Sequence, residues 1–242
     1  MSREITPYQR ENQQKKEQVE EMFDSIAPTY DRLNRLLSMR IDKQWRKNVI
    51  SLLKKQQPNS ILDIATGTAD LAIAMNKLQP EQLIGLDLSE EMLAVGRKKL
   101  KAKQLEKQIE LVKGDSEDLP FENESFDAIT CAFGVRNFGN LRAGLREMCR
   151  VVKQDGQVII LEFSKPSNKI FQKLYYFYFF NVLPFVGNLL SGDKRAYTYL
   201  PESVKAFPSG DEFATELKES GFKTVLCKPQ TFGICTIYQA KK

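Results

Sequence analysis

Apolar side chains recur at helical spacing through the first 57 residues of the chain. The repeats fall at Val19, Met22, Phe23 and Ile26, then at Leu33, Leu36 and Leu37, and then at Trp45, Val49, Leu52 and Leu53. Positions three or four apart share one face of an α-helix, so each repeat predicts an amphipathic helix. Because Pro28 has no backbone N–H, we expect it to separate the first helix from the second. Residues 1–57 are therefore predicted to form a helical cap.

From Ser60 onward, short β-rich runs alternate with helical patterns. The predicted strands are Ile61–Ile64, Leu83–Asp87, Ile109–Val112, Phe126–Cys131, Val158–Phe163, Phe222–Cys227 and Gly233–Gln239. The predicted helices are Asp70–Leu78, Glu90–Lys103, Leu141–Val152 and Asp211–Ser220. Strands that alternate with helices form right-handed crossovers. The pattern therefore predicts an α/β fold with a mostly parallel seven-stranded sheet and helices on both faces.

An aromatic insertion of about residues 167–208 interrupts this alternation after Lys165. Its aromatic and aliphatic side chains are Phe171, Leu174, Tyr175, Phe177, Tyr178, Phe179 and Phe180, and its flanking cations are Lys169, Lys173, Lys194 and Arg195. The most apolar stretch, residues 174–190, has 17 residues and contains Pro184, whereas a membrane span needs about 20 uninterrupted apolar residues. One helix face cannot bury so many apolar side chains. We therefore expect the insertion to line an apolar channel and to contact a bilayer surface.

The composition is that of a globular protein, and it excludes several kinds of chemistry. The chain has 242 residues, of which 42% are hydrophobic and 28% are charged. It contains no histidine, which excludes Ser–His and Cys–His catalysis and histidine-ligated metal sites. The four cysteines lie in apolar runs without C-x-x-C spacing, so we expect reduced core residues and no metal site.

The turn after the first predicted strand has the features of a nucleoside-binding loop. Gly67 lies in a small-residue turn that lets a ligand approach the backbone closely. Asp87 ends the next strand 20 residues later, the spacing at which a carboxylate binds ribose hydroxyls. Asp63 and Asp70 flank the turn. These carboxylates would repel the pyrophosphate of a dinucleotide and attract the ammonium and sulfonium of S-adenosylmethionine.

Acidic and basic side chains follow the third and fourth predicted strands. Asp115 and Ser116 can bind an adenine ring through a carboxylate and a backbone amide. Arg136 and Asn137 come just after the fourth strand, at the same sheet edge. An arginine does not act as a base in proteins, so Arg136 is predicted to stabilise an oxyanion, with Asn137 holding a hydroxyl or a water.

These segments resemble the class I S-adenosylmethionine-dependent methyltransferases. The shared motifs are Asp63–Asp70 (DIATGTAD), Gly85–Ser89 (GLDLS) and Gly114–Phe121 (GDSEDLPF). Narrower motifs are similar to the ubiquinone/menaquinone biosynthesis C-methyltransferases: Ala27–Asp31 (APTYD), Phe133–Asn137 (FGVRN), Leu161–Pro166 (LEFSKP), Tyr197–Leu200 (YTYL) and Phe207–Pro208. The resemblance implies one Rossmann-like methyltransferase domain over residues 1–242, in which residues 167–208 lie on the substrate side.

What the resemblance implies about function is methylation of one ring carbon of a prenylated hydroquinone. It implies S-adenosylmethionine as cofactor, bound by Thr68, Asp87 and the Asp115–Ser116 pair. Asp63 and Gly67 complete the expected cofactor site, and Arg136, Asn137 and Tyr30 are the expected catalytic residues, with Tyr30 positioning the ring. The prenyl tail would occupy the channel of the aromatic insertion. We favour demethylmenaquinol as the substrate, in menaquinone biosynthesis.

Other interpretations remain open from the sequence. They are the benzoquinol step of ubiquinone biosynthesis, methylation of another small molecule or of RNA, and a non-catalytic ligand-binding module. The basic run of residues 97–103 is more typical of a solvated helix face than of a nucleic-acid site, so we expect no nucleic-acid partner. Because no signal peptide is recognised, we expect a cytoplasmic protein that associates peripherally with the inner face of the membrane. The oligomeric state is open, a homodimer included.

Overall fold

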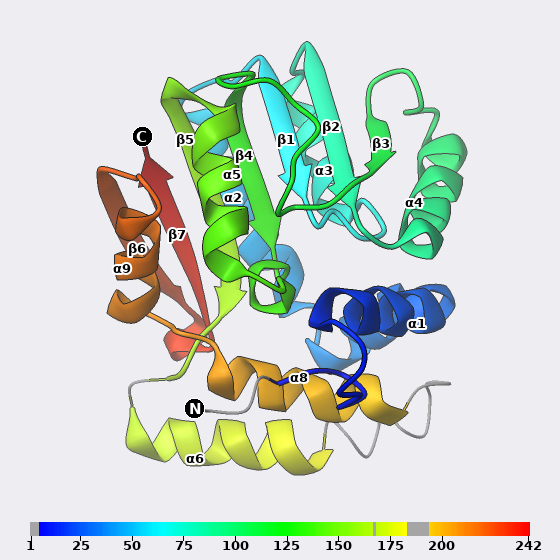
Figure 1. Ribbon diagram of the computed structural model, residues 1–242, viewed down its shortest axis with the longest axis vertical. Coiled ribbons are helices and arrows are strands. Elements are labelled where there is room, and N and C mark those ends of the chain that lie inside the picture. Colours follow the sequence, from blue (N-terminus) through cyan, green and yellow to red (C-terminus); the bar gives the residue numbers. More distant parts are fainter. Residues whose placement is uncertain (1–4, 167, 183–193) are drawn as a thin grey trace.

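A sheet of seven strands runs through the centre of the molecule (Figure 1). This computed structural model describes residues 5–166, 168–182 and 194–242. The predictions made for residues 183–190 and for the side chains of Leu174 and Lys194 lie outside this described part. The strands are β1 (Ser60–Ile64), β2 (Gln82–Asp87), β3 (Glu110–Lys113), β4 (Phe126–Ala132), β5 (Val152–Phe163), β6 (Thr224–Gln230) and β7 (Cys235–Lys241).

The strand order is β3-β2-β1-β4-β5-β7-β6. Strands β1 to β5 pair in parallel, and β7 is antiparallel to both of its neighbours. The predicted α/β fold with a mostly parallel sheet is therefore confirmed. From β1 the chain adds β2 and β3 on one side of the sheet and then returns to add β4 and β5 on the other side. This reversal of the strand order opens a crevice at the carboxyl ends of β1 and β4, which is where open parallel sheets bind ligands.

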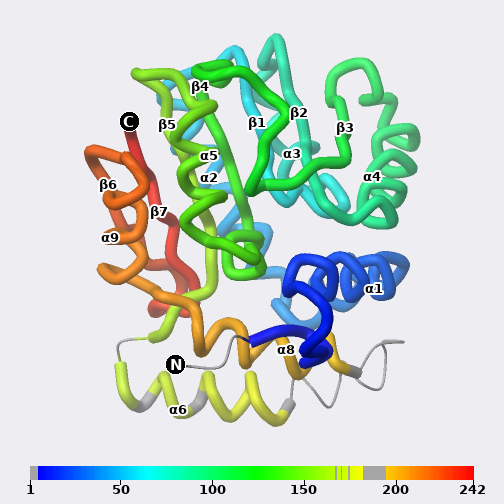
Figure 2. The backbone as a smooth tube through the Cα atoms, viewed as in Figure 1, coloured from blue at the N-terminus to red at the C-terminus, as the bar shows by residue number. Residues whose placement is uncertain are grey.

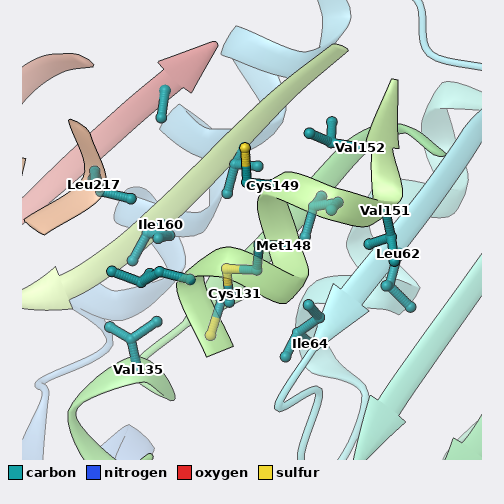
Figure 3. Close-up of a cluster of buried hydrophobic side chains, with 14 of the residues drawn as sticks. Leu62, Ile64, Cys131, Val135, Met148, Cys149, Val151, Val152, Ile160 and Leu217 are labelled. Carbon is teal, nitrogen blue, oxygen red and sulfur yellow. The ribbon is translucent and has the colours of Figure 1, made fainter. Parts of the chain in front are cut away.

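Helices pack on both faces of the sheet. They are α2 (Ile41–Lys54), α3 (Asp70–Met75) with the 3₁₀ turn Asn76–Leu78, α4 (Glu90–Lys103), α5 (Leu141–Val151) and α9 (Asp211–Glu219). One core cluster joins α2, α3 and α4 to the sheet, and the other joins α5 and α9 to its opposite face. In this second cluster, Met148 of α5 and Leu217 of α9 pack with Ile64, Cys131 and Ile160 of the central strands (Figure 3).

Three further helices gather at the carboxyl ends of the parallel strands (Figure 1). They are α1 (Lys15–Leu37), α6 (Lys169–Phe177), which continues into a π-helical turn (Tyr178–Val182), and α8 (Lys194–Ala206). Figure 2 shows that α1 is far from α6 and α8 along the chain, although the three helices lie together in space. A third apolar cluster, which includes Met22, Ile26, Tyr175, Phe179 and Tyr199, binds them to one another.

The predicted break at Pro28 is wrong. Helix α1 continues through Pro28 from Lys15 to Leu37. A proline in a helix removes one N–H donor, and here burial of one helix face offsets that loss. Met22, Ile26 and Leu33 are each at most 5% exposed, on the same face.

Polar contacts along its length hold α1 against the sheet edge. Lys16 Nζ lies 2.7 Å from Asp115 Oδ2, and Lys15 Nζ donates to the Phe138 carbonyl at 2.8 Å. Further along, Ser89 Oγ donates to Asp24 Oδ1 at 2.5 Å. Helix α1 therefore covers the crevice between β1 and β4, and we call it the roof helix.

Candidate active site

Two cavities adjoin at the carboxyl ends of the parallel strands. The first, which we call the cleft, has an empty volume of about 710 Å³ and lies beside the Gly67 turn. The second, which we call the chamber, has an empty volume of about 1170 Å³ and lies between α1, α6 and α8, lined mainly by aliphatic and aromatic side chains. The residues that line both cavities are Phe23, Tyr30, Phe133 and Asn137.

The Gly67 turn and the end of β2 form the floor of the cleft. Gly67 has a φ of +58°, and a Cβ built there would meet no heavy atom within 4 Å, so the backbone is open to a ligand. The Gly67 N–H donates to Asp87 Oδ2 at 2.7 Å, and the Ser89 N–H donates to Asp87 Oδ1 at 2.9 Å. Burial raises the pKa of the Asp87 carboxyl to about 6. Each carboxylate oxygen keeps a lone pair for a further donor, such as a ribose hydroxyl.

Asp115 and Ser116 line the cleft as the sequence predicted. Asp115 Oδ1 accepts the Glu117 N–H at 2.9 Å, which fixes the loop after β3. Its other oxygen faces Lys16 at 2.7 Å, and this contact raises the pKa of Lys16. The roof helix thus contributes a cation to the rim of the cleft.

Asp63 does not line the cleft, although the sequence placed it in the cofactor site. Its carboxylate is 1% exposed and lies behind the turn. Thr66 Oγ1 donates to it at 2.7 Å and Thr130 Oγ1 donates at 2.6 Å, so both oxygens are engaged by β1 and β4 neighbours. Burial raises the pKa of Asp63 from 3.8 to about 6. Asp63 therefore stabilises the Gly67 turn from its buried side.

Thr68 also turns away from the cleft, into a charged network under the roof helix. Its hydroxyl donates to Asp31 Oδ1 at 2.6 Å and accepts from Lys99 Nζ at 3.0 Å. Lys99 also pairs with Asp31, at 2.9 Å, and with Asp70. The expectation that the basic run is a solvated face is thus wrong for Lys99, whose side chain is 19% exposed.

Asp70 belongs to the same network, so it is not free to attract a sulfonium. Burial acts to raise its pKa, but Lys99, Arg46 and Arg35 together lower it. Arg46 and Arg35 lie 3.6 and 3.7 Å from the Asp70 carboxylate. The network connects α1, α2 and α4 to the helix that follows the Gly67 turn, so it fixes that turn indirectly.

Arg136 lines the chamber and is held by a buried ion pair. Its Nη1 donates to Glu162 Oε1 at 2.9 Å and to the Phe133 carbonyl at 2.5 Å. Glu162 is fully buried at the end of β5, and the Phe163 N–H also donates to it at 2.8 Å. Burial raises the pKa of Glu162, while the charge of Arg136 opposes that rise. The Arg136 Nε has no partner among the described residues, so it remains able to donate to a ligand.

Asn137 and Tyr30 lie where the cleft meets the chamber. Asn137 is 7% exposed, and its Oδ1 has no hydrogen-bond partner in the described part of the chain. Burial raises the pKa of the Tyr30 phenol, so this side chain stays protonated at neutral pH. The structure therefore brings all three predicted catalytic residues to the chamber, two of them at its boundary with the cleft.

Sequence reasoning missed two residues of this site. Glu162 lies inside the quoted LEFSKP motif, where an acidic residue in an otherwise apolar strand was the available signal. Lys16 gave no signal, because its contact with Asp115 joins positions 99 residues apart.

The sequence that builds this site matches a known enzyme family over nearly the whole chain. A profile of the ubiE/COQ5 methyltransferase family matches residues 11–242. The chain belongs to this family. The resemblance inferred from the short motifs is thus confirmed, and the protein is a methyltransferase.

Individual relatives are similar along almost their full length. A demethylmenaquinone methyltransferase of Bacteroides fragilis is 48% identical, over 98% of this chain and 97% of the relative. A ubiquinone/menaquinone biosynthesis C-methyltransferase UbiE of Geobacter sulfurreducens is 42% identical, over 95% of this chain and 90% of the relative.

Solved structures confirm the predicted fold. An S-adenosylmethionine-dependent methyltransferase of Thermotoga maritima superposes with a TM-score of 0.65, at 19% identity, over 93% of this methyltransferase and 99% of that chain. A second one, from Methanococcus maripaludis, gives a TM-score of 0.63 at 20% identity, over 89% and 91% of the two chains. The fold is therefore that of the class I methyltransferases, as the sequence predicted.

We predict a pH-dependent stability difference between the Asp63→Asn variant and the wild type. The folded state holds the Asp63 proton more tightly than the unfolded state does, because the pKa rises from 3.8 to about 6 on folding. Ionisation of Asp63 therefore lowers the free energy of unfolding of the wild type, and this loss grows as the pH rises from 3.8 to about 6. A shift of about 2 units corresponds to about 3 kcal/mol. The variant should gain that much relative to the wild type between pH 4 and pH 7, measured by urea unfolding.

The control is Asp127→Asn, at the opposite end of the parallel strands from Asp63. Bonds from Lys153 and Ser60 lower the pKa of Asp127 from 3.8 against the effect of burial. This variant should therefore be less stable than the wild type by an amount that stays nearly constant between pH 4 and pH 7, because the pH-dependent part of the difference lies below that range. A pH-independent difference for Asp63→Asn would contradict the assignment of a raised pKa to this carboxyl.

Proposed function

We propose that this methyltransferase transfers a methyl group from S-adenosylmethionine to a ring carbon of a prenylated hydroquinone, with demethylmenaquinol as the substrate. One observation carries the proposal. A cleft lined by carboxylates, Asp87 and Asp115 among them, meets a large apolar chamber at a shared wall, and Arg136 and Asn137, which line the chamber, carry buried polar atoms without a partner among the described residues. The Bacteroides fragilis relative is, by its name, a demethylmenaquinone methyltransferase.

The residues of the cleft fit S-adenosylmethionine. Asp87 and Asp115 suit a ligand with ribose hydroxyls, an amino group and a positive charge, and they disfavour a pyrophosphate. Asp87 would hold the ribose, and Asp115 with Ser116 would hold the adenine. The open space above Gly67 admits the ligand close to the backbone. When bound, S-adenosylmethionine supplies an electrophilic methyl carbon attached to a sulfonium.

The chamber can hold a ring with a long hydrocarbon tail. Its walls include Ile26, Trp45, Phe163, Phe179 and Leu200. Burying an apolar tail against such side chains contributes about 25 cal/mol per Å² of surface removed from water. The tail therefore supplies binding free energy, and the polar atoms near Arg136 are left to orient the ring.

Arg136 and Asn137 activate the ring as a nucleophile. A phenolate places negative charge on the ring carbon beside it, so stabilising the phenolate favours attack by that carbon. One ring hydroxyl donates to Oδ1 of Asn137 before it loses its proton to solvent water, and the free Nε of Arg136 donates to the same oxygen once it is a phenolate. Because Glu162 neutralises Arg136, the pair stabilises the oxyanion mainly through an oriented N–H, as preorganised donors do in oxyanion holes.

A methyl-transfer assay tests the proposed function. Purified protein with methyl-labelled S-adenosylmethionine and detergent-dispersed demethylmenaquinol should yield menaquinol, identified by a mass increase of one methylene unit. A prenylated benzoquinol and a structured RNA serve as competing substrates. Transfer to the benzoquinol alone would reassign the substrate, and transfer to neither quinol would refute the proposal.

We predict that removing the charged pair abolishes most of the turnover and leaves folding intact. Arg136→Gln alone would leave Glu162 buried and unpaired, which is strongly destabilising, so the variant to make is Arg136→Gln with Glu162→Gln. Loss of one oriented donor costs about 10²–10³ in kcat. The affinity for S-adenosylmethionine, measured by calorimetry, should not change, because Arg136 lines the chamber and not the cleft.

The matched control replaces an ion pair of similar length away from the site. Arg150 and Glu147 lie 2.6 Å apart on α5, and the Arg150→Gln, Glu147→Gln variant should keep the wild-type kcat. Wild-type turnover in the Arg136 and Glu162 double variant would remove Arg136 from the mechanism.

We propose further that the mouth of the chamber rests on a lipid surface. The exposed apolar side chains Leu36, Met39, Phe177 and Phe180 are 55%, 70%, 62% and 40% exposed. Tyr178 Oη donates to the Leu37 carbonyl at 2.7 Å, which joins the two segments that carry them. Within the residues that the structure describes, every helix is too short or too polar to cross a membrane.

We predict that these side chains determine binding to vesicles. The wild type should float with liposomes that contain anionic lipid, and a Met39→Ser, Phe177→Ser variant should remain largely in the soluble fraction. Leu226 is also exposed, at 58%, but it lies on β6 and not on the two segments that carry the other four side chains, so a Leu226→Ser variant is the control and should float like the wild type. A wild type that stays wholly soluble would contradict this part of the proposal.

A further inference from the structure

The hydroxyl of Tyr175 is a buried polar group that the mechanism above does not use. The side chain is 6% exposed and lines the chamber. Its oxygen has no hydrogen-bond partner in the described part of the chain. Buried hydroxyls in folded proteins are nearly always hydrogen-bonded, so an unpaired one on a side chain that lines a ligand cavity points to a ligand as its partner.

Tyr175 is connected to Arg136 by a row of packed rings. The Tyr175 ring stacks on Phe179 with 4.7 Å between centroids, and Phe179 meets Phe163 edge-on at 5.7 Å. The Arg136 guanidinium lies 5.5 Å from the centroid of Phe163. These contacts fix the position of the Tyr175 side chain relative to Arg136, the residue that would hold the phenolate.

The hydroxyl is suited to donate a hydrogen bond and not to remove a proton. Burial raises the pKa of Tyr175 well above the ordinary value for a phenol, and the charges of Arg136 and Glu162 also act on it. A tyrosine with a raised pKa stays protonated at neutral pH. An acceptor oxygen on the ligand would therefore satisfy it.

Several other polar groups of the chamber already have partners. Tyr178 donates to the Leu37 carbonyl at 2.7 Å, and Ser38 Oγ donates to Asp42 Oδ1, also at 2.7 Å. The Nε of Arg46 has no partner among the described residues, but the guanidinium is held by its ion pairs with Asp42 at 2.7 Å and with Asp70 at 3.6 Å. Tyr175 is therefore better placed than these groups to bind a second polar atom of the substrate.

We propose that Tyr175 donates a hydrogen bond to the second ring oxygen of the quinol, the one that Arg136 and Asn137 do not hold. This inference rests on the proposed function. A 1,4-hydroquinone has oxygens at opposite edges of its ring, and one attachment point leaves the ring free to rotate about it. A second attachment point determines which ring carbon faces the cleft. Tyr175 is thus a specificity-determining residue.

The test compares two substrates in wild type and in Tyr175→Phe. The first is a short-chain prenylated 1,4-naphthalenediol. The second is the corresponding 1-naphthol, which keeps the hydroxyl beside the methylated carbon and lacks the other one. Loss of one hydrogen bond lowers kcat/KM about three- to tenfold. Tyr175→Phe should show this loss with the diol and no loss with the naphthol.

Two controls separate recognition from structure. Tyr176→Phe changes a neighbouring ring that does not line the chamber, and it should leave both substrates unaffected. The unliganded Tyr175→Phe protein should melt at or above the wild-type temperature, because the hydroxyl it lacks has no partner in the free protein.

Equal losses with both substrates, no loss with either, or a clear drop in melting temperature would overturn the inference. Each of these results leaves the proposed function standing, provided that the wild type methylates the diol. If the wild type methylates neither substrate, the proposed function fails and this inference fails with it.

Discussion

The buried pair of Arg136 and Glu162 is the constraint on which the site depends. Glu162 is the next-to-last residue of β5 and Arg136 follows β4, so the pair joins two neighbouring strands at the edge where ligands bind. Burying a lone carboxylate or guanidinium is costly, and the attraction between the two offsets that cost only when their hydrogen bonds are satisfied. The Phe133 carbonyl and the Phe163 N–H satisfy further hydrogen bonds of the pair, and the buried Nε of Arg136, which has no partner among the described residues, is left for a ligand. The pair thereby fixes the two phenylalanines that form the inner wall of the chamber.

The roof helix α1 depends on a second set of charges. Asp31 and Thr68 connect it to the turn beside Gly67, and Lys16 connects its first turn to Asp115. Since α1 also supplies Met22, Ile26 and Tyr30 to the chamber, one rigid element forms part of both cavities. Its tolerance of Pro28 follows from this double anchoring together with the buried helix face, because contacts on either side of the proline hold the helix in place.

The sequence predicted the sheet well because its signals are local. The central strands contain short apolar runs, and Asp87 ends β2 while Asp115 follows β3, where a parallel sheet binds its ligands. It did not predict which way side chains in the turn point. Asp63 and Thr68 lie within a few residues of Gly67, yet they face β4 and α1. Their partners are 67 and 37 residues away, so no spacing rule reveals them. The pairing of Lys99 with Asp31 escaped prediction for the same reason.

The rims of the two cavities differ in character. Charged side chains such as Lys16, Glu20 and Glu117 border the cleft, whereas Leu37, Met39 and Tyr178 border the chamber. The nucleoside product and the methylated lipid product would therefore leave through separate openings, one polar and one apolar. The nucleoside product can then leave to water while the lipid product is still bound in the chamber. The two products need not leave in a fixed order.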